Sequence, residues 1–487
     1  MRMGGVRKSV LGGALTGAVL LSAGPAAADT LQEALTKAYY DNPQLEAARA
    51  QLRSTDETVV IQRADGLPTV SGSGTYTEYL KQSSSSFLSP ERGLGAGIDL
   101  NVPLYSGGAV KNGIQAAENR ISAGRADLRG TESELFAQVV AAYMDVLRNE
   151  AIVGLTANNI DVLQINLEAT SDRFEIGDVT RTDVAQSESR LALGQSDLQS
   201  AQANLISARE NYIALVGDAP DDLQPPPPLP GLPEDVEGVV DVALANNPDL
   251  IAAQERAEAA GYDIKVAGSG RLPRVSGFTG GTYQNYLGTL GSVPGSPSAD
   301  QTSTGAQAGV RLSLPIFQGG RVAAQQRQAT AIADANLEQV VAVERNVIAQ
   351  VRAAYSSWRA ANAIILSTQT AVDAAALSLE GVRAENTVGN RTILDILDAQ
   401  QELLRAQVQL VTARRNAYVA GFNLLATMGR AEARDLGLGE TGVLYDPVEN
   451  YERVRGIIWD WQKDPLPVAD SSRTVDIPAQ DAEIPQQ

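Results

Sequence analysis

The chain has 487 residues, with no histidine and no cysteine, and its formal net charge at neutral pH is -19. Without imidazole bases, common zinc or copper ligands, or thiolate nucleophiles, and with no local signature of carboxylate or serine–lysine catalysis, we expect no enzyme, no cofactor and no metal site. The acidic charge also disfavours nucleic acid as a partner, because nucleic acid binds basic surfaces.

Residues 1–28 have the pattern of a secretory signal peptide. A basic start precedes an apolar run over 10–23, and Ala26 and Ala28 fit a cleavage site. An uncleaved membrane anchor is the alternative, but the run is short and rich in small residues. No later segment is apolar over the 18 residues that a membrane helix needs. We therefore expect an exported protein.

The remainder is a structural unit that occurs twice, over 29–217 and 234–430. Asn247-Pro248 repeats Asn42-Pro43 at an offset of 205, and residues 315–320 repeat 103–108 at an offset of 212. Matches that keep their register across strands, turns and helices indicate duplication. Each copy begins with a helix, over 31–62 in the first copy, which the Asn-Pro pair interrupts.

Two strands are predicted in each unit. Apolar and polar residues alternate over 94–104 and over 306–316, and the weaker partner strands are 70–80 and 275–286. Alternation over roughly ten residues fits a membrane-spanning strand with one apolar face. The edge of a soluble sandwich shows the same pattern, but the flanking helices are too long to pack over so small a sheet.

A long helical hairpin follows each strand pair. In the first copy it descends to residue 174 and returns over 180–215. The leading helix and the return helix together match the descending helix, so we expect a cylinder wall of continuous and two-piece helices. Apolar residues recur every seven positions along both descending helices, which predicts supercoiled packing. They are Val139, Val146, Val153, Ile160, Leu167 and Phe174 in the first copy, and Val351, Trp358, Ile365, Val372 and Leu379 in the second.

Each hairpin is predicted to turn at a glycine, which ends one helix, followed by a polar residue that starts the next. We expect the functional residues of the protein to lie at these tips. The turn residues are Gly177 and Thr180 in the first copy and Gly389 and Thr392 in the second, and the charged residues near them are Asp183, Arg391, Asp395 and Asp398.

Three further segments complete the chain. The proline-rich residues 218–233 form a stiff linker between the two units, expected along the outside of the helical cylinder. Residues 431–462 form a last small element near the same level. Residues 463–487 are rich in proline and aspartate and are predicted to be disordered.

The tip sequence from Val388 to Asp398, the duplication and the strand pairs together resemble the TolC-like outer-membrane efflux channels. The resemblance covers nearly all of 29–430. It implies a mainly α-helical fold with a β-barrel part: a homotrimer that closes a twelve-stranded barrel in the outer membrane of a Gram-negative bacterium and continues as a periplasmic α-helical tunnel. Four strands cannot close a barrel, so oligomerisation is required on physical grounds, while the number three comes from the resemblance.

The resemblance also implies that a periplasmic adaptor docks on the tips, at Gly177, Thr180, Gly389 and Thr392, and that a gate lies there. Arg391 and Asp183 fall at positions that link neighbouring hairpins, and Asp395 and Asp398 at positions that line the closed entrance. Under threefold symmetry these two aspartates, three residues apart on one helix face, would form two rings of carboxylates. The plain alternative is a solvated helix face. Asn386 stands where the family often has a tyrosine, so one contact of the gate is expected to differ.

The favoured function is a passive exit duct in a tripartite export system, for small molecules, for secreted polypeptides in type I secretion, or for both. Its implied partners are outer-membrane lipid, a periplasmic adaptor protein and an inner-membrane ABC exporter or proton-driven pump. The alternative is a periplasmic adaptor or coiled-coil scaffold. That class would explain the hairpins but not the four alternating strands.

Overall fold

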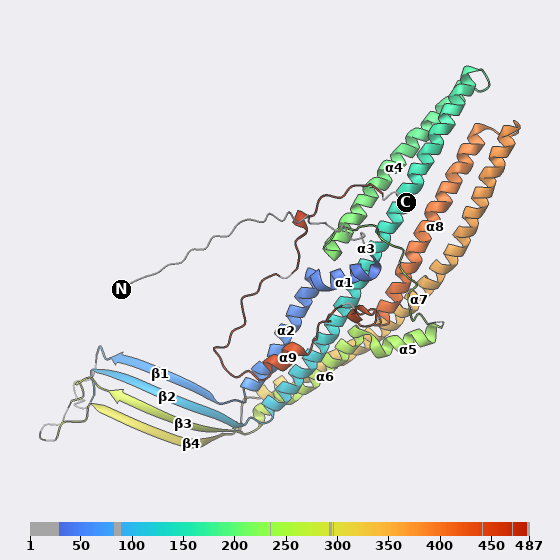
Figure 1. The fold of residues 1–487 in the computed structure, drawn as a ribbon. Coiled ribbons are helices and arrows are strands. Elements are labelled where there is room, and N and C mark those ends of the chain that lie inside the picture. Colours follow the sequence, from blue (N-terminus) through green and yellow to red (C-terminus); the bar gives the residue numbers. More distant parts are fainter. Residues whose placement is uncertain are drawn as a thin grey trace, which may run out of the picture.

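The computed structural model describes residues 29–81, 89–233, 235–291, 295, 297–440, 442–469 and 471–484. The predicted signal peptide, residues 1–28, lies outside them. A single sheet occupies one end of the molecule, and two helical hairpins extend from the other end (Figure 1). Within the described residues, no helix is both long and apolar enough to cross a bilayer.

The sheet contains β1 (Thr69–Glu78), β2 (Arg92–Tyr105), β3 (Arg274–Asn285) and β4 (Thr302–Ser313). Their order follows the sequence, and every pairing is antiparallel. The four predicted strands are thereby confirmed. β1 and β4 are the edges of the sheet in this single chain.

One face of the sheet carries apolar side chains that have no cover within the chain. Leu94 and Ile98 on β2 are 42% and 66% exposed, and Val310 and Leu312 on β4 are 69% and 65% exposed. So much exposed apolar surface is unfavourable in water and marks an interaction surface.

Each half of the chain opens with a short helix and a longer one: α1 (Leu31–Asp41) and α2 (Pro43–Ala64), then α5 (Val236–Asn246) and α6 (Pro248–Gly268). Asn42 caps α2, because its side-chain oxygen accepts the N–H groups of Gln44 and Leu45 at 2.9 and 3.4 Å. Proline is tolerated at the first helical position, where the amide would lack an intrahelical partner. The predicted interruption at both Asn-Pro pairs is confirmed.

The hairpins are α3 (Ala109–Glu175) with α4 (Arg181–Val216), and α7 (Arg321–Thr387) with α8 (Ile393–Thr427). α3 and α7 each have 67 residues, which corresponds to about 100 Å. α2 and α4 lie along the two ends of α3 (Figure 1). The predicted pairing of continuous with two-piece helices is therefore confirmed for this half of the chain.

The seven-residue repeat packs well at mid-helix and less well at the tip. Val139, Val146 and Val153 are buried, whereas Phe174 is 44% exposed in the single chain. Near the tip, Leu163 and Thr170 are the buried positions of α3 instead. Thr170 faces the buried Ser187 of α4, with 3.5 Å between their hydroxyl oxygens. Small polar residues therefore replace apolar ones where the helices of this hairpin meet near the turn.

The main core surrounds the middle of α3. Tyr143 is fully buried there, and its hydroxyl oxygen lies within hydrogen-bonding distance of the carbonyl oxygens of Asp29 and Gln224, at 2.9 and 2.6 Å. Gln224 belongs to the linker 218–233, whose Leu223 is buried in the same core. The linker is thus fastened to the hairpins at mid-length.

The C-terminal segment departs from the prediction of disorder. Residues 471–484 lie against the first hairpin, where Arg209 of α4 donates to the carbonyl oxygens of Asp481 and Glu483 at 3.0 and 2.9 Å. The Arg209 side chain is only 10% exposed. A guanidinium so nearly buried needs acceptors, and the C-terminal backbone supplies two of them.

The remaining helices are short. α9 (Glu449–Val454) lies against α2, and single turns of 3₁₀ helix occur at η1 (Ser269–Arg271), η2 (Leu438–Glu440) and η3 (Thr474–Asp476).

Candidate functional site

The first hairpin tip is closed by a left-handed glycine. Gly177 has φ +82°, a conformation that other residues adopt only with strain. Its N–H donates to the carbonyl of Phe174 at 3.0 Å, and the N–H of Asp178 donates to that of Arg173 at 2.8 Å. These bonds satisfy the last carbonyl groups of α3.

A capping box starts α4 directly after this turn. The hydroxyl and N–H of Thr180 each donate to the Asp183 carboxylate at 2.8 Å, and the N–H of Asp183 donates back to the Thr180 hydroxyl at 3.4 Å. The hydrogen bonds from Thr180 hold the pKa of Asp183 below its usual value. The capping box alone therefore explains why an aspartate is found at position 183.

The second tip repeats this design. Gly389 also has φ +82°. The N–H and hydroxyl of Thr392 donate to Asp395 at 2.8 Å, and these bonds lower the pKa of the Asp395 carboxyl. A Cβ placed on Gly177 or Gly389 would meet no described atom within 4 Å, so both turns are open to an approaching molecule.

Arg391 is held within its own hairpin in the single chain. Its Nε donates to the Glu385 carboxylate at 2.7 Å, and its Nη1 lies 3.9 Å from the Asp395 carboxylate. Asn386 donates from its amide to the Arg391 carbonyl at 2.7 Å. The residue that departs from the family's tyrosine thus stabilises the turn that presents Arg391.

Asp398 makes a contact that the sequence analysis did not anticipate. Its carboxylate lies 2.6 Å from Nη2 of Arg190 on α4, so this ion pair joins the second hairpin to the first. A hollow of about 190 Å³ adjoins the pair, and the buried Leu163 and Leu397 contribute to its wall. Arg190 and Asp398 are 208 residues apart, and only the packing of the two hairpins brings them together.

The predicted gate residues therefore fall into separate local groups within one chain. Asp183 bonds to Thr180, Asp395 to Thr392 and Arg391, and Asp398 to Arg190. Among the described residues, no cluster of three or more carboxylates or other ligating side chains could hold a metal ion. The tips offer charged and hydrogen-bonding surface rather than a reaction centre.

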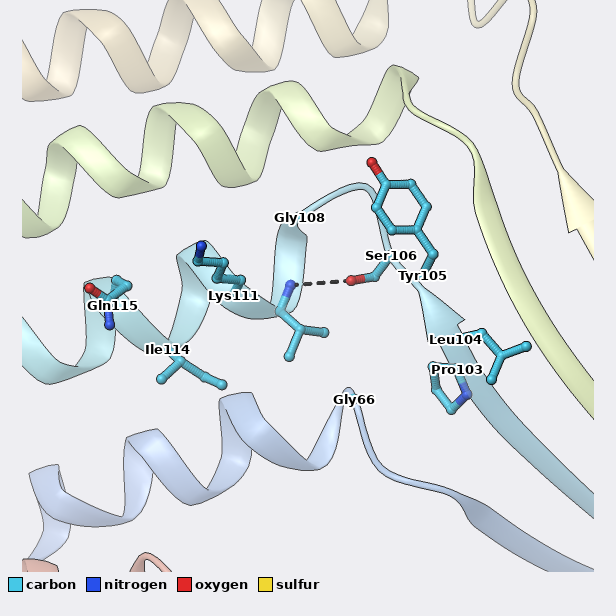
Figure 2. Close-up of a pocket in the computed structure, with 10 residues that line it drawn as sticks. Gly66, Pro103, Leu104, Tyr105, Ser106, Gly108, Lys111, Ile114 and Gln115 are labelled. Carbon is cyan, nitrogen blue, oxygen red and sulfur yellow. Dashed lines mark hydrogen bonds between the residues drawn. The ribbon is translucent and has the colours of Figure 1, made fainter.

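The junction between the helices and the sheet contains a second hollow, of about 520 Å³, between the α2–β1 and β2–α3 connections (Figure 2). Gly66 lines it from the α2–β1 connection, and Leu104 and Tyr105 at the end of β2, with Ser106 just after them, line it from the other side. The Ser106 hydroxyl accepts the N–H of Val110, in the first turn of α3, at 3.4 Å. Its wall contains one charged side chain and no acid–base pair, which fits a structural junction.

Comparison with known proteins gives a consistent result. The model of the outer membrane efflux protein family matches residues 34–218 and 239–430. The outer membrane efflux protein BepC of Brucella suis is 34% identical over 451 residues, which are 92% of this chain and 95% of that protein. Outer membrane protein TolC of Escherichia coli is 28% identical over 329 residues, 65% of each chain. The crystal structure of VceC from Vibrio cholerae shares the fold, with a TM-score of 0.69 at 22% identity, over 82% of this chain and 96% of that one.

Proposed function

Because the chain belongs to the outer membrane efflux protein family, we propose that it forms a homotrimeric exit duct whose entrance is gated at the hairpin tips. The role of exit duct and the location in the outer membrane, with a periplasmic helical tunnel, follow from the family itself. The number of chains, the gate residues and the partners are the proposal.

The open sheet is the observation that supports a trimer most directly. β1 and β4 each leave one edge unpaired in the single chain. In an up-and-down order of four strands the two edges run antiparallel, so β4 of one chain can pair with β1 of the next. Three copies would give a closed barrel of twelve strands, which removes every edge.

Mass measurement of the detergent-solubilised protein tests the trimer. We expect a single species with three chains, which should dissociate only on heating. A stable, membrane-inserted monomer would contradict the proposal, because its unpaired edges would lie in lipid.

The capping boxes and the charged side chains at the tips would have different roles in the gate. The capping boxes hold each turn rigid, and the exposed Arg391 is placed to exchange its contact with Glu385 for one with a neighbouring hairpin. Asp395 and Asp398 would repeat around the threefold axis as rings of negative charge. Rings of carboxylates attract cations into a narrow lumen.

Single-channel recording in planar bilayers tests the gate. Arg391→Ser should raise the open conductance, because the contact between neighbouring hairpins is lost. Asp395→Asn with Asp398→Asn should remove block by a trivalent cation. Asparagine is preferred to alanine at 395 because its amide oxygen can still accept the N–H of Thr392 in the capping box. Wild-type conductance in the first variant and full cation block in the second would assign the gate to other residues.

The exposed tips fit the docking of a periplasmic adaptor, with an inner-membrane ABC exporter or proton-driven pump beyond it. The chain contains no cysteine, so a single cysteine gives a unique cross-linking site. Asp178→Cys and Asn390→Cys, both at exposed tip positions, should cross-link to the adaptor, whereas Gln32→Cys on α1 should not. The pump that co-purifies then decides the cargo, since an ABC exporter favours polypeptides and a proton-driven pump favours small molecules.

A further inference from the structure

The turn after α9 exposes an unusual amount of aromatic surface. Trp459 and Trp461 are 68% and 78% exposed, and Ile458 beside them is 69% exposed. They are two of the three tryptophans in the chain. The third, Trp358, is half-buried and packs against Tyr355, with 6.0 Å between ring centroids. Large apolar side chains grouped in this way mark an interaction surface.

This turn is held in place and is not a loose tail. The N–H of Gln462 donates to the carbonyl of Trp459 at 3.1 Å, which closes the turn. On either side of it, Arg453 and Asp464 form two parallel bonds of 3.0 Å. The tryptophans are therefore presented on a defined structure.

The turn lies at the level where the helices meet the sheet. Tyr451 of α9 packs against Val59 of α2 and Ile121 of α3, near the sheet ends of both helices. Arg63, in the last turn of α2, donates to the carbonyl of Arg455. Three residues beyond Arg63, Gly66 lines the junction shown in Figure 2.

The exposed apolar surface of the sheet continues to this same level. Leu104 and Tyr105, at the helical end of β2, are 59% and 52% exposed, and Ile316 and Phe317, just beyond β4, are 93% and 88% exposed. Because the strands span the outer membrane, this end of the sheet marks the boundary between bilayer and periplasm.

We propose that Ile458, Trp459 and Trp461 form an interfacial anchor that inserts into the headgroup region of the periplasmic leaflet of the outer membrane. Tryptophan favours this region because its ring is apolar while its indole N–H can still donate a hydrogen bond. Asp460 and Lys463 would stay in the hydrated layer, where the Lys463 ammonium can meet lipid phosphate. The anchor lies outside the barrel and would fix the depth of the duct independently of it.

A neighbouring chain is the other possible occupant of this surface. Lipid is favoured because the apolar band of the sheet ends at the level of the turn, and because polar residues alternate with the tryptophans. A dry protein interface depletes charged residues at its centre, whereas here Asp460 separates the two rings.

Fluorescence of the full-length protein in phosphatidylcholine vesicles tests the anchor. The vesicles carry bromine either near the headgroup or near the bilayer centre. Headgroup bromine should remove most of the emission of the Trp358→Phe protein, whose two remaining tryptophans are those of the turn. In the matched variant, Trp459→Phe with Trp461→Phe, only Trp358 emits. It lies 37 residues along α7 from the start of that helix, about 55 Å away, so its emission should not change.

The outcomes are distinct. Emission of the Trp358→Phe protein that is insensitive to bromine but quenched by acrylamide would place the turn in water and overturn the anchor. Emission insensitive to both would place it against a second chain and also overturn it. The inference rests on the outer-membrane location, and flotation separates the two failures. A protein that floats with the vesicles without quenching contradicts only the anchor, and one that fails to float contradicts the location as well.

Discussion

The ion pair between Arg190 and Asp398 should restrain opening of the duct. It is the salt bridge near the tips that joins α4 of the first hairpin to α8 of the second, with 2.6 Å between Nη2 and the carboxylate oxygen. If the entrance opens by moving one hairpin away from the other, this pair must break. Arg190→Gln removes its charge while keeping a side chain of similar length.

The size of the effect follows from exposure and copy number. The side chains of Arg190 and Asp398 are 32% and 58% exposed. A pair so exposed contributes about 0.2–1 kcal/mol. Three copies in the proposed trimer would together contribute about 0.6–3 kcal/mol if opening breaks all of them, which corresponds to a change in the open-to-closed ratio of about 3- to 150-fold.

Open probability in planar bilayers at low salt measures this change, and the difference from wild type should shrink in 1 M salt, where the Debye length falls to about 3 Å. Arg173→Gln is the matched control. It removes a tip ion pair of similar length, 2.8 Å to Asp178, and of similar exposure, but that pair lies within one hairpin. Equal opening in both variants would refute the reasoning, because any lost surface charge would then have the same effect.

Three other outcomes are expected. Gly429→Ala should lower stability by several kcal/mol, since Gly429 has φ +69° and a Cβ would lie 2.3 Å from a backbone oxygen. Gly437→Ala, at φ +74° with no described atom within 4 Å of its Cβ, should cost only about 1–2 kcal/mol in the same thermal melts. Burial raises the pKa of Glu132 from 4.5 to about 7. The unfolded carboxyl ionises first, so stability should fall by about 3 kcal/mol as pH rises from about 4.5 to about 7. Glu132→Gln should flatten that pH dependence of the urea midpoint, and an unchanged slope would contradict the assignment. Arg209→Met should cost roughly 3 kcal/mol, because it leaves the Glu150 carboxylate 17% exposed without its cation. Residues 471–484 should then be cut faster in limited proteolysis, and Glu150→Gln should restore part of the lost stability.

Most of the fold could be predicted because the sequence signals for its helices and strands are local and occur in both copies of the repeated unit. Alternating residues predicted β2 and β4, weaker patterns predicted β1 and β3, and the Asn-Pro pairs predicted the breaks before α2 and α6. A glycine followed by a polar residue predicted the turn of each hairpin. A second copy with the same motifs in the same order then removed most of the ambiguity of each single signal.

The candidate site was harder to predict, since its contacts are set by packing. Asp183 and Asp395 were chosen for their charge, but their position three residues after a threonine is also the signature of a capping box, which the structure contains. Arg190 was missed because nothing near it in the sequence points to Asp398. The contact of the C-terminal segment with the first hairpin was missed for the same reason, because nothing near Asp481 in the sequence points to the buried Arg209 on α4.

The unpaired edges of the sheet also bear on how the protein is made. A newly exported chain presents β1 and β4 as ready templates for any other strand, so it is prone to aggregate until its neighbours arrive. Biogenesis would therefore depend on periplasmic chaperones that cover these edges. One defective chain would also prevent the barrel of the proposed trimer from closing. If half of the chains carried a proline that breaks pairing in β1, only about one eighth of the proposed trimers would be assembled from intact chains alone, so such an allele should be dominant over the wild type.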